Sequence, residues 1–288
     1  MKLLKALLVG SLLTVSSMAM AQLKLSVFYA KPDAFAVTST LVMGEKEAIL
    51  IDTGFSRADA LRIAAEVLDS QKRLTTILVS QADPDYYFGV STLKAIFPEA
   101  KVVAPPQVLA EIKEKLETKL SVWTPQLGTN QPLLPMVLPE ALDKPQLTLE
   151  NEVIEIRDSE GQYGNRPFVW IPSLKTITGN VNVYGNMHLW TADSQTKASR
   201  EAWQKQLDEM LALNPECVIP GHQIGGAKED KSLVEFNKKY LTQFEEVLSK
   251  NHKSEDVIKA MEKLYPNLQG VDNLEFSAKV NTGEVKWD

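Results

Sequence analysis

The sequence predicts one compact α/β domain. Segments with the patterns of strands and helices alternate along the chain, and no low-complexity tract or clear linker separates them. The two halves also share one order of elements: several strands, a helix, a short strand and a polar loop at the end of that strand. A length of 288 residues with 44% hydrophobic residues supplies ample apolar material for a core.

Alternating and β-branched runs predict the strands of the first half, and apolar spacing predicts its helices. The predicted strands cover 24–29, 35–42, 47–52, 75–80 and 101–104. The predicted helices cover 57–69, 91–97 and 106–119. Five prolines between 121 and 145 then predict a loop or cover segment.

The second half repeats these patterns and adds a C-terminal extension. The predicted strands cover 147–150, 152–157, 167–171, 174–179 and 216–219. The predicted helices cover 196–213, 232–249 and 254–264, and a terminal hairpin with Phe276 and Trp287 is expected to follow. We expect the segment 230–288 to complete the core; capping a cleft and mediating dimerisation are the alternatives.

The first 21 residues have the pattern of a secretory signal peptide. Lys2 and Lys5 precede an apolar stretch over 7–15, and Ala19-Met20-Ala21 gives the small-x-small pattern before a cleavage site. An N-terminal membrane anchor is the alternative, but the stretch is shorter than the roughly 20 residues of a span. We therefore expect cleavage after Ala21, a mature domain over 22–288 without a membrane span, and a periplasmic or secreted protein.

Charge and cysteine content exclude several classes of function. The chain has 31 Lys and Arg against 37 Asp and Glu, so a broad nucleic-acid surface is not expected. The single cysteine, Cys217, excludes an intramolecular disulfide and a multi-cysteine metal site. It lies in an apolar run, which predicts a packed thiol rather than a nucleophile. Neither a Gly-x-Ser-x-Gly elbow nor a glycine-rich phosphate loop occurs.

The loop 80–89 reads SQADPDYYFG and follows a predicted strand. It resembles the metal-binding loop of the metallo-β-lactamase fold superfamily, which reads Thr-His-x-His-x-Asp-His-x-x-Gly. Four further stretches are similar to family segments in the same order, at 49–54, 176–180, 185–193 and 218–222. The resemblance implies a four-layer αβ/βα sandwich, in which two mixed β-sheets are flanked by helices and the functional cleft lies along one edge.

The resemblance also implies where metal ligands would stand. Position by position, they are Gln81, Asp83, Asp85, Tyr86, Asp158, Asn180 and His222. Only Asp85 and His222 keep the family's residue type. Zinc sites prefer imidazole and thiolate, whereas this set is rich in oxygen donors. The set predicts calcium, magnesium or manganese rather than a two-zinc centre, if a metal binds at all.

Two chemical interpretations follow for this site. With a hard cation, Asp85 would act as a ligand or general base and His222 as a ligand or proton carrier. Without one, three converging carboxylates would raise a pKa or recruit Arg157 or Arg166. We also expect one ring of the run 86–88 to contact a ligand, and the other two to pack in the core.

Two functions therefore stand side by side. The first is an exported hydrolase-like protein that acts on a small ester, lactone, amide or phosphoester through Asp85 and His222. The alternative is an inactive member that binds a small ligand or a protein partner through the same cleft. The sequence leaves the substrate and the oligomeric state open.

Overall fold

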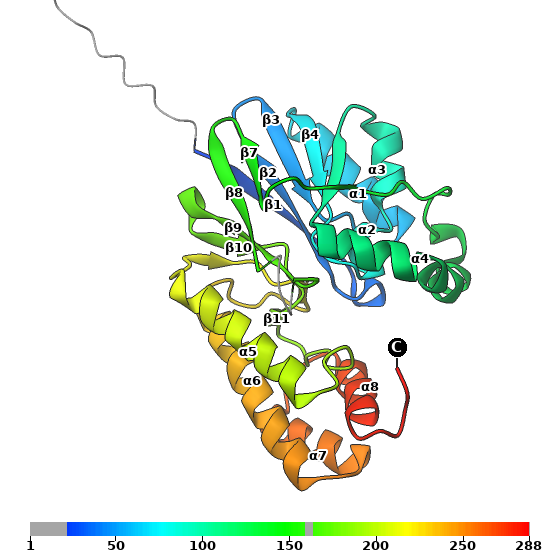
Figure 1. Ribbon diagram of the computed structural model, residues 1–288, viewed down its shortest axis with the longest axis vertical. Helices are drawn as coiled ribbons and strands as arrows, with labels where there is room; N and C mark the ends of the chain where they lie inside the picture. Colours follow the sequence, from blue (N-terminus) through cyan, green and yellow to red (C-terminus); the bar gives the residue numbers. More distant parts are fainter. Residues whose placement is uncertain (1–21, 159–163, 288) are drawn as a thin grey trace, which may run out of the picture.

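The computed structural model describes residues 22–158 and 164–287 (Figure 1). The predicted signal peptide lies outside these residues. Two main β-sheets pack together, and helices cover their outer faces, so the predicted α/β sandwich is confirmed. A short parallel pair, β11 (Tyr184–Gly185) and β13 (His222–Gln223), lies beside them. Within the described residues, no helix is long and apolar enough to cross a membrane.

The first sheet has six strands in chain order. They are β1 (Lys24–Tyr29), β2 (Thr38–Met43), β3 (Glu47–Ile51), β4 (Arg73–Leu78), β5 (Lys101–Ala104) and β6 (Glu140–Ala141). The first three strands pair antiparallel, and the pairs from β3 to β6 are parallel. The sheet is therefore mixed.

The second sheet has five strands in the order β12, β10, β9, β8, β7. Their bounds are β7 (Gln146–Leu149), β8 (Glu152–Arg157), β9 (Phe168–Ile171), β10 (Thr176–Thr178) and β12 (Cys217–Val218). Only β10 and β12 pair parallel, so this sheet is also mixed. Cys217 lies in β12 as expected, but it is half-buried rather than packed in the core.

Alternation along β3 shows how the layers are held together. Ile49 and Ile51 face the second sheet and pack in one apolar cluster with Val169 and Ile171 of β9. Leu50 faces the opposite way, into a cluster with the outer helices. Successive side chains of a strand point to opposite faces, so one buried strand serves two apolar layers.

Helices form both outer layers. On the first sheet lie α1 (Arg57–Asp69), α3 (Val90–Ile96) and α4 (Pro106–Leu127), and the single turn α2 (Pro84–Tyr87) precedes α3. On the second lie α5 (Lys197–Ala212) and α6 (Lys231–Lys250), and α7 (Ser254–Leu264) and α8 (Val271–Asn281) continue from α6 beyond the sheet, with α7 packed on α6 and α8 on α7 (Figure 1). Helices α5 and α6 lie side by side (Figure 1).

Two predicted segments are wrong. Helix α4 continues to Leu127, into the predicted loop, because Leu116, Leu120, Trp123 and Leu127 continue its apolar face against the core. The predicted terminal hairpin is helix α8 instead. Its Leu274 and Ala278 are buried at helical spacing in the same apolar cluster as Met261 of α7, a contact that the terminal aromatic residues did not indicate.

Candidate functional site

Polar loops from both halves of the chain meet at one edge of the two sheets. The loop after β10 and the side chain of Tyr86 in α2 approach the turn between β12 and β13 so closely that Gly221 has no room for a side chain. A Cβ there would lie 2.0 Å from the carbonyl oxygen of Asn180 and 2.6 Å from the hydroxyl of Tyr86. The contact brings segments together that are far apart in sequence.

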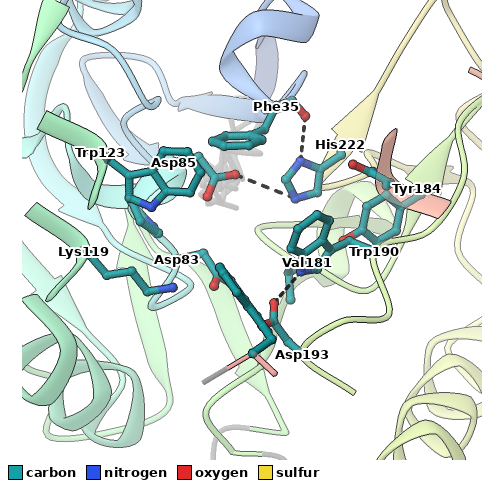
Figure 2. Close-up of a pocket in the computed structure, with 13 residues that line it drawn as sticks. Phe35, Asp83, Asp85, Lys119, Trp123, Val181, Tyr184, Trp190, Asp193 and His222 are labelled. Carbon is teal, nitrogen blue, oxygen red and sulfur yellow. Dashed lines mark hydrogen bonds and ion pairs between the residues drawn. The ribbon is translucent and has the colours of Figure 1, made fainter. Parts of the chain in front are cut away.

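A cavity of about 90 Å³ opens at this edge (Figure 2). Its walls are made by helix α4, the turn α2, the loops that follow β10 and β11, helix α8 and the C-terminal tail. The lining side chains are Phe35, Asp83, Pro84, Asp85, Lys119, Trp123, Val181, Tyr184, Trp190, Asp193, His222, Asn273 and Trp287. We refer to this cavity as the aromatic pocket.

His222 and Asp85 face each other across one end of the aromatic pocket (Figure 2). The His222 Nε2 atom lies 3.8 Å from Asp85 Oδ2. The other ring nitrogen, Nδ1, donates a hydrogen bond of 3.0 Å to the carbonyl oxygen of Phe35, which can only accept. Burial lowers the pKa of His222 to about 4. The imidazole is therefore neutral at pH 7, with the lone pair on Nε2, which also lies 3.1 Å from the Tyr86 hydroxyl.

The Asp85 carboxyl lies in an apolar setting. It is 5% exposed, and its burial, together with the nearby Asp83 carboxylate, raises its pKa well above the usual range. In the described chain, no Lys or Arg forms an ion pair with it. The arrangement supplies a protonated carboxyl and a basic imidazole nitrogen on one wall, which are the groups of an acid–base pair.

Asp83 belongs to a different electrostatic network. Its Oδ2 lies 3.5 Å from Arg166, whose guanidinium also reaches Asp193 at 3.4 Å. Burial still raises the pKa of Asp83, against the effect of Arg166. Arg166 is thus the cation that the sequence suggested for these carboxylates, whereas Arg157 pairs with Glu155 at 2.7 Å.

Asp193 holds two indole rings at the mouth of the pocket. Its carboxylate oxygens accept hydrogen bonds from Trp190 Nε1 at 2.8 Å and from Trp287 Nε1 at 2.7 Å. Desolvation raises the pKa of Asp193, but Arg166 and the indole donors outweigh it and hold the pKa below its usual range. The ionised carboxylate therefore fixes the two rings that frame the opening.

The predicted ligand positions of the loop 80–89 divide into two groups. Asp83 and Asp85 line the pocket, whereas Gln81 and Tyr86 are buried and bonded within the protein. The Gln81 amide donates to the carbonyl oxygens of Pro167 at 2.7 Å and Gly179 at 3.3 Å. The rings of the run 86–88 are all 1% exposed and none is among the side chains that line the pocket, so the expectation that one of them contacts a ligand stays a prediction.

The later ligand positions are also divided. His222 lines the pocket. The Asn180 amide donates to the carbonyl of Ile219 and accepts from the N–H of Val183, each at 3.0 Å. Asp158 lies in a separate surface cavity and accepts a hydrogen bond of 2.8 Å from Gln206. The structure therefore brings three of the seven predicted side chains to the pocket: Asp83, Asp85 and His222.

The donors present do not fit the metal centre of the superfamily. Across 22–158 and 164–287, no group of three or more His, Cys, Asp or Glu side chains is placed to hold a metal ion. The Asn180 amide is committed to backbone groups through both of its polar atoms, whereas Gln81 donates through Nε2 and its buried Oε1 has no hydrogen-bond partner. The predicted preference for calcium, magnesium or manganese stays a prediction, and the placement of the donors does not favour it.

Several pocket residues were not identified from sequence. Lys119 and Trp123 come from α4, Asn273 from α8 and Trp287 from the C-terminal tail. Asp193 lies in the stretch 185–193, whose similarity to a family segment was visible, but nothing in that pattern indicated its bonds to two indoles. Only the tertiary contacts bring these residues together.

The comparisons agree with this architecture. The sequence pattern of the metallo-beta-lactamase superfamily matches residues 32–160. Among curated proteins, no sequence matches the chain. A metallo-beta-lactamase family protein from Thermus thermophilus has a similar structure, with a TM-score of 0.60, 14% identity and 91% of each chain covered.

Two further solved structures are similar. The DIM-1 metallo-beta-lactamase gives a TM-score of 0.54 at 18% identity, covering 77% of this chain and 94% of its own. A double mutant of the sec-alkyl sulfatase PisA1 gives 0.57 at 13% identity, covering 90% of this chain and 50% of its own. The chain therefore has the metallo-β-lactamase fold, and its residues 32–160 match the metallo-beta-lactamase superfamily.

Proposed function

We propose that this protein binds a small organic molecule in the aromatic pocket. The observation that carries the proposal is the division of the predicted ligand set. Tyr86 and Asn180 are engaged in internal hydrogen bonds, and Gln81 donates to backbone carbonyls, so none of the three lines the cavity. The predicted ligands that do line it are Asp83, Asp85 and His222, and they lie beside a wall of aromatic rings. A concave site with aromatic walls and few polar groups is typical of small-molecule binding.

A blocking variant tests this proposal. Val181 is 5% exposed and lines the pocket, so Val181→Phe should fill part of the cavity. We expect ligands that raise the melting temperature of the unaltered protein in a compound panel to lose that effect in Val181→Phe. The matched control is Val153→Phe, at a strand position that is 38% exposed. Ligand shifts that survive in Val181→Phe would contradict binding in this pocket.

Hydrolysis of a small ester, lactone, amide or phosphoester is the second candidate. The facing of Asp85 and His222 favours it, because a protonated carboxyl can protonate a leaving group while the imidazole accepts a proton from water. Loss of such a group lowers kcat by about 10² to 10⁴. We expect Asp85→Asn and His222→Gln each to lower turnover of any active substrate by that range. Turnover equal to that of the unaltered protein would remove the residue from catalysis.

We further propose that the protein is exported. The support is the pattern of positive, apolar and small residues over 1–21. N-terminal sequencing of protein from its natural host should begin at Gln22, and fractionation should place it outside the cytoplasm. An intact Met1 in cytoplasmic protein would contradict export.

A further inference from the structure

Asp85 is the carboxyl of the aromatic pocket that has no described Lys or Arg ion-pair partner, and it stays neutral by keeping its proton. Asp83, Asp85 and Asp193 contribute three carboxyls, and Lys119 and Arg166 contribute two cations. We propose that the pocket binds an organic monocation, whose positively charged head lies against Asp85 and among the rings of the wall. The inference rests on the proposed small-molecule binding and names the class of ligand.

Asp85 is the group that an external cation would satisfy. Its side chain is nine-tenths buried and points into the cavity (Figure 2). Arg166 is taken up by the other two carboxylates, and the nearest described ion-pair partner of Asp85 is the His222 imidazole at 3.8 Å. A buried carboxylate is stable only when paired, so Asp85 releases its proton to solvent when a bound cation supplies the positive charge, and the ligand gains specificity from that pair.

The rings supply the second half of the recognition. Trp123, Tyr184, Trp190 and Trp287 line the cavity from four separate segments of the chain. Faces of aromatic rings attract cations through their quadrupoles, most strongly where water is excluded. One of these rings already takes a cation, since the Lys119 ammonium lies 5.8 Å from the centroid of Trp287. The remaining ring faces are suited to an alkylammonium head.

Asp193 acts here as a positioning residue. It holds the indoles of Trp190 and Trp287 by their N–H groups, and the two ring centroids lie 6.0 Å apart at 79°. Phe276 stacks on Trp190 at 5.0 Å and braces the pair from α8. The rings are therefore preorganised, which reduces the entropy lost when a ligand binds.

A wider groove continues from the pocket and has room for a ligand tail. Its volume is about 700 Å³, and it shares Phe35, Trp123, Trp190, Asn273 and Trp287 with the aromatic pocket. Met187, Ile224 and Phe276 add apolar surface. The geometry is suited to a cation with an apolar tail, the head in the pocket and the tail in the groove.

Three isosteric probes test the charge of the ligand. Choline, 3,3-dimethylbutan-1-ol and 3,3-dimethylbutanoate carry heads of the same shape, and the trimethylammonium head of choline alone is cationic. Isothermal titration of the purified protein at pH 7.5 and low salt should give a Kd for choline at least about tenfold below that of either other probe. Hexyltrimethylammonium should bind more tightly still, because its chain enters the groove.

Two variants test whether Asp85 and Trp287 contact the bound cation. Asp85→Asn keeps the shape of the side chain and cannot ionise to pair with a bound cation, so choline should weaken by at least about tenfold while the neutral alcohol changes less than about twofold. Trp287→Leu removes one ring at the end of the chain and should weaken choline by about fivefold. Asp69→Asn, an exposed aspartate at the end of α1, is the matched control and should leave every Kd unchanged. Circular dichroism and melting temperatures establish that each variant is folded.

The possible results distinguish a failure of cation recognition from a failure of small-molecule binding. If the alcohol or the carboxylate binds as tightly as choline or more tightly, and Val181→Phe abolishes that binding, the ligand need not be a cation. That result would contradict this inference and support small-molecule binding in the pocket. An equal loss of all three probes in Asp85→Asn would also overturn the role of its charge. No heat from any probe, together with no compound that shifts the melting temperature in the panel, would overturn both.

Discussion

The two aspartates of the loop 80–89 are separated by one residue and differ in their electrostatic environment. Asp83 is paired with Arg166, whereas Asp85 has no described Lys or Arg partner and lies buried beside a neutral imidazole. Burial raises the pKa of both, but Arg166 offsets part of the desolvation cost at Asp83. Removing the ionisable group should therefore raise stability more at Asp85 than at Asp83.

We expect Asp85→Asn to raise the free energy of unfolding at pH 7.5 by about 1–2 kcal/mol, since the variant relieves a buried ionisable group of its desolvation cost. Asp83→Asn should raise it by less, because the lost interaction with Arg166 offsets part of the gain. Urea denaturation of both variants measures the two changes. Destabilisation by Asp85→Asn would mean that the carboxylate is ionised and paired in solution.

The buried carboxyl of Asp52 should make the free energy of unfolding depend on pH. It is 1% exposed, and burial raises its pKa from 3.8 to about 7, although two hydrogen bonds from Ser80 oppose the shift. Because the folded pKa exceeds the unfolded one, the stability that this carboxyl contributes is fully present below about pH 4 and is lost as the pH rises through 7.

Asp52→Asn should remove that dependence. The amide keeps both contacts, because its oxygen accepts from the Ser80 N–H and its nitrogen donates to Ser80 Oγ. We expect the variant to exceed the unaltered protein in stability by up to about 4 kcal/mol at pH 8, from about 1.4 kcal/mol per pKa unit, and to match it near pH 4. Denaturation curves of both proteins at pH 4 and pH 8 measure this difference in the free energy of unfolding. The same difference at both pH values would contradict the raised pKa of Asp52.

At the scale of elements, the turn between β12 and β13 packs tightly against the loop after β10 and positions His222. Gly221 approaches the Asn180 carbonyl so closely that Gly221→Ala must move one backbone against the other. We expect a loss of about 2–3 kcal/mol and weaker ligand binding, since overpacking forces backbone shifts. Gly226→Ala, where open space surrounds a backbone φ of +73°, is the control and should cost about 1 kcal/mol. Equal losses would show that contact with Asn180 is not the cause.

At the scale of the whole molecule, the metallo-β-lactamase fold is kept while its ligand loops are used differently. Three of the predicted metal ligands form hydrogen bonds inside the protein instead. The Tyr86 hydroxyl bonds to the Asn180 carbonyl and lies within hydrogen-bond distance of His222, and the Asn180 amide bonds to the carbonyl of Ile219 beside β12. Fold alone does not fix chemistry, and here the strand-end loops make an aromatic pocket.

We expect the purified protein to carry no stoichiometric zinc, and 1 mM calcium, magnesium, manganese or zinc to leave its melting temperature unchanged. A cation at 100 times its Kd would stabilise the fold by about 2.7 kcal/mol, which a melting curve resolves readily. Elemental analysis by mass spectrometry supplies the count of bound ions. One equivalent of a divalent ion, removed by Asp83→Ala with Asp85→Ala, would contradict our interpretation of these donors.

Local patterns in the sequence determined most of the elements. The apolar spacing of α1 and α7 predicts both helices to the residue, because periodicity depends only on which face each element buries. The loop 80–89 and the turn with His222 were also identified as neighbours at one edge, through their similarity to family segments. These features depend on residues close in sequence or on one family resemblance.

The tertiary structure decided which side chains make the site. Tyr86, Tyr87 and Phe88 occur beside the predicted ligands yet pack inward, while Trp123 and Trp287 reach the pocket from α4 and the C-terminal tail. Hydrogen-bond partners and burial depend on contacts between distant segments, and no local pattern encodes them. The physical reason is that strand-end loops acquire their chemistry from what packs against them, which only the assembled layers determine.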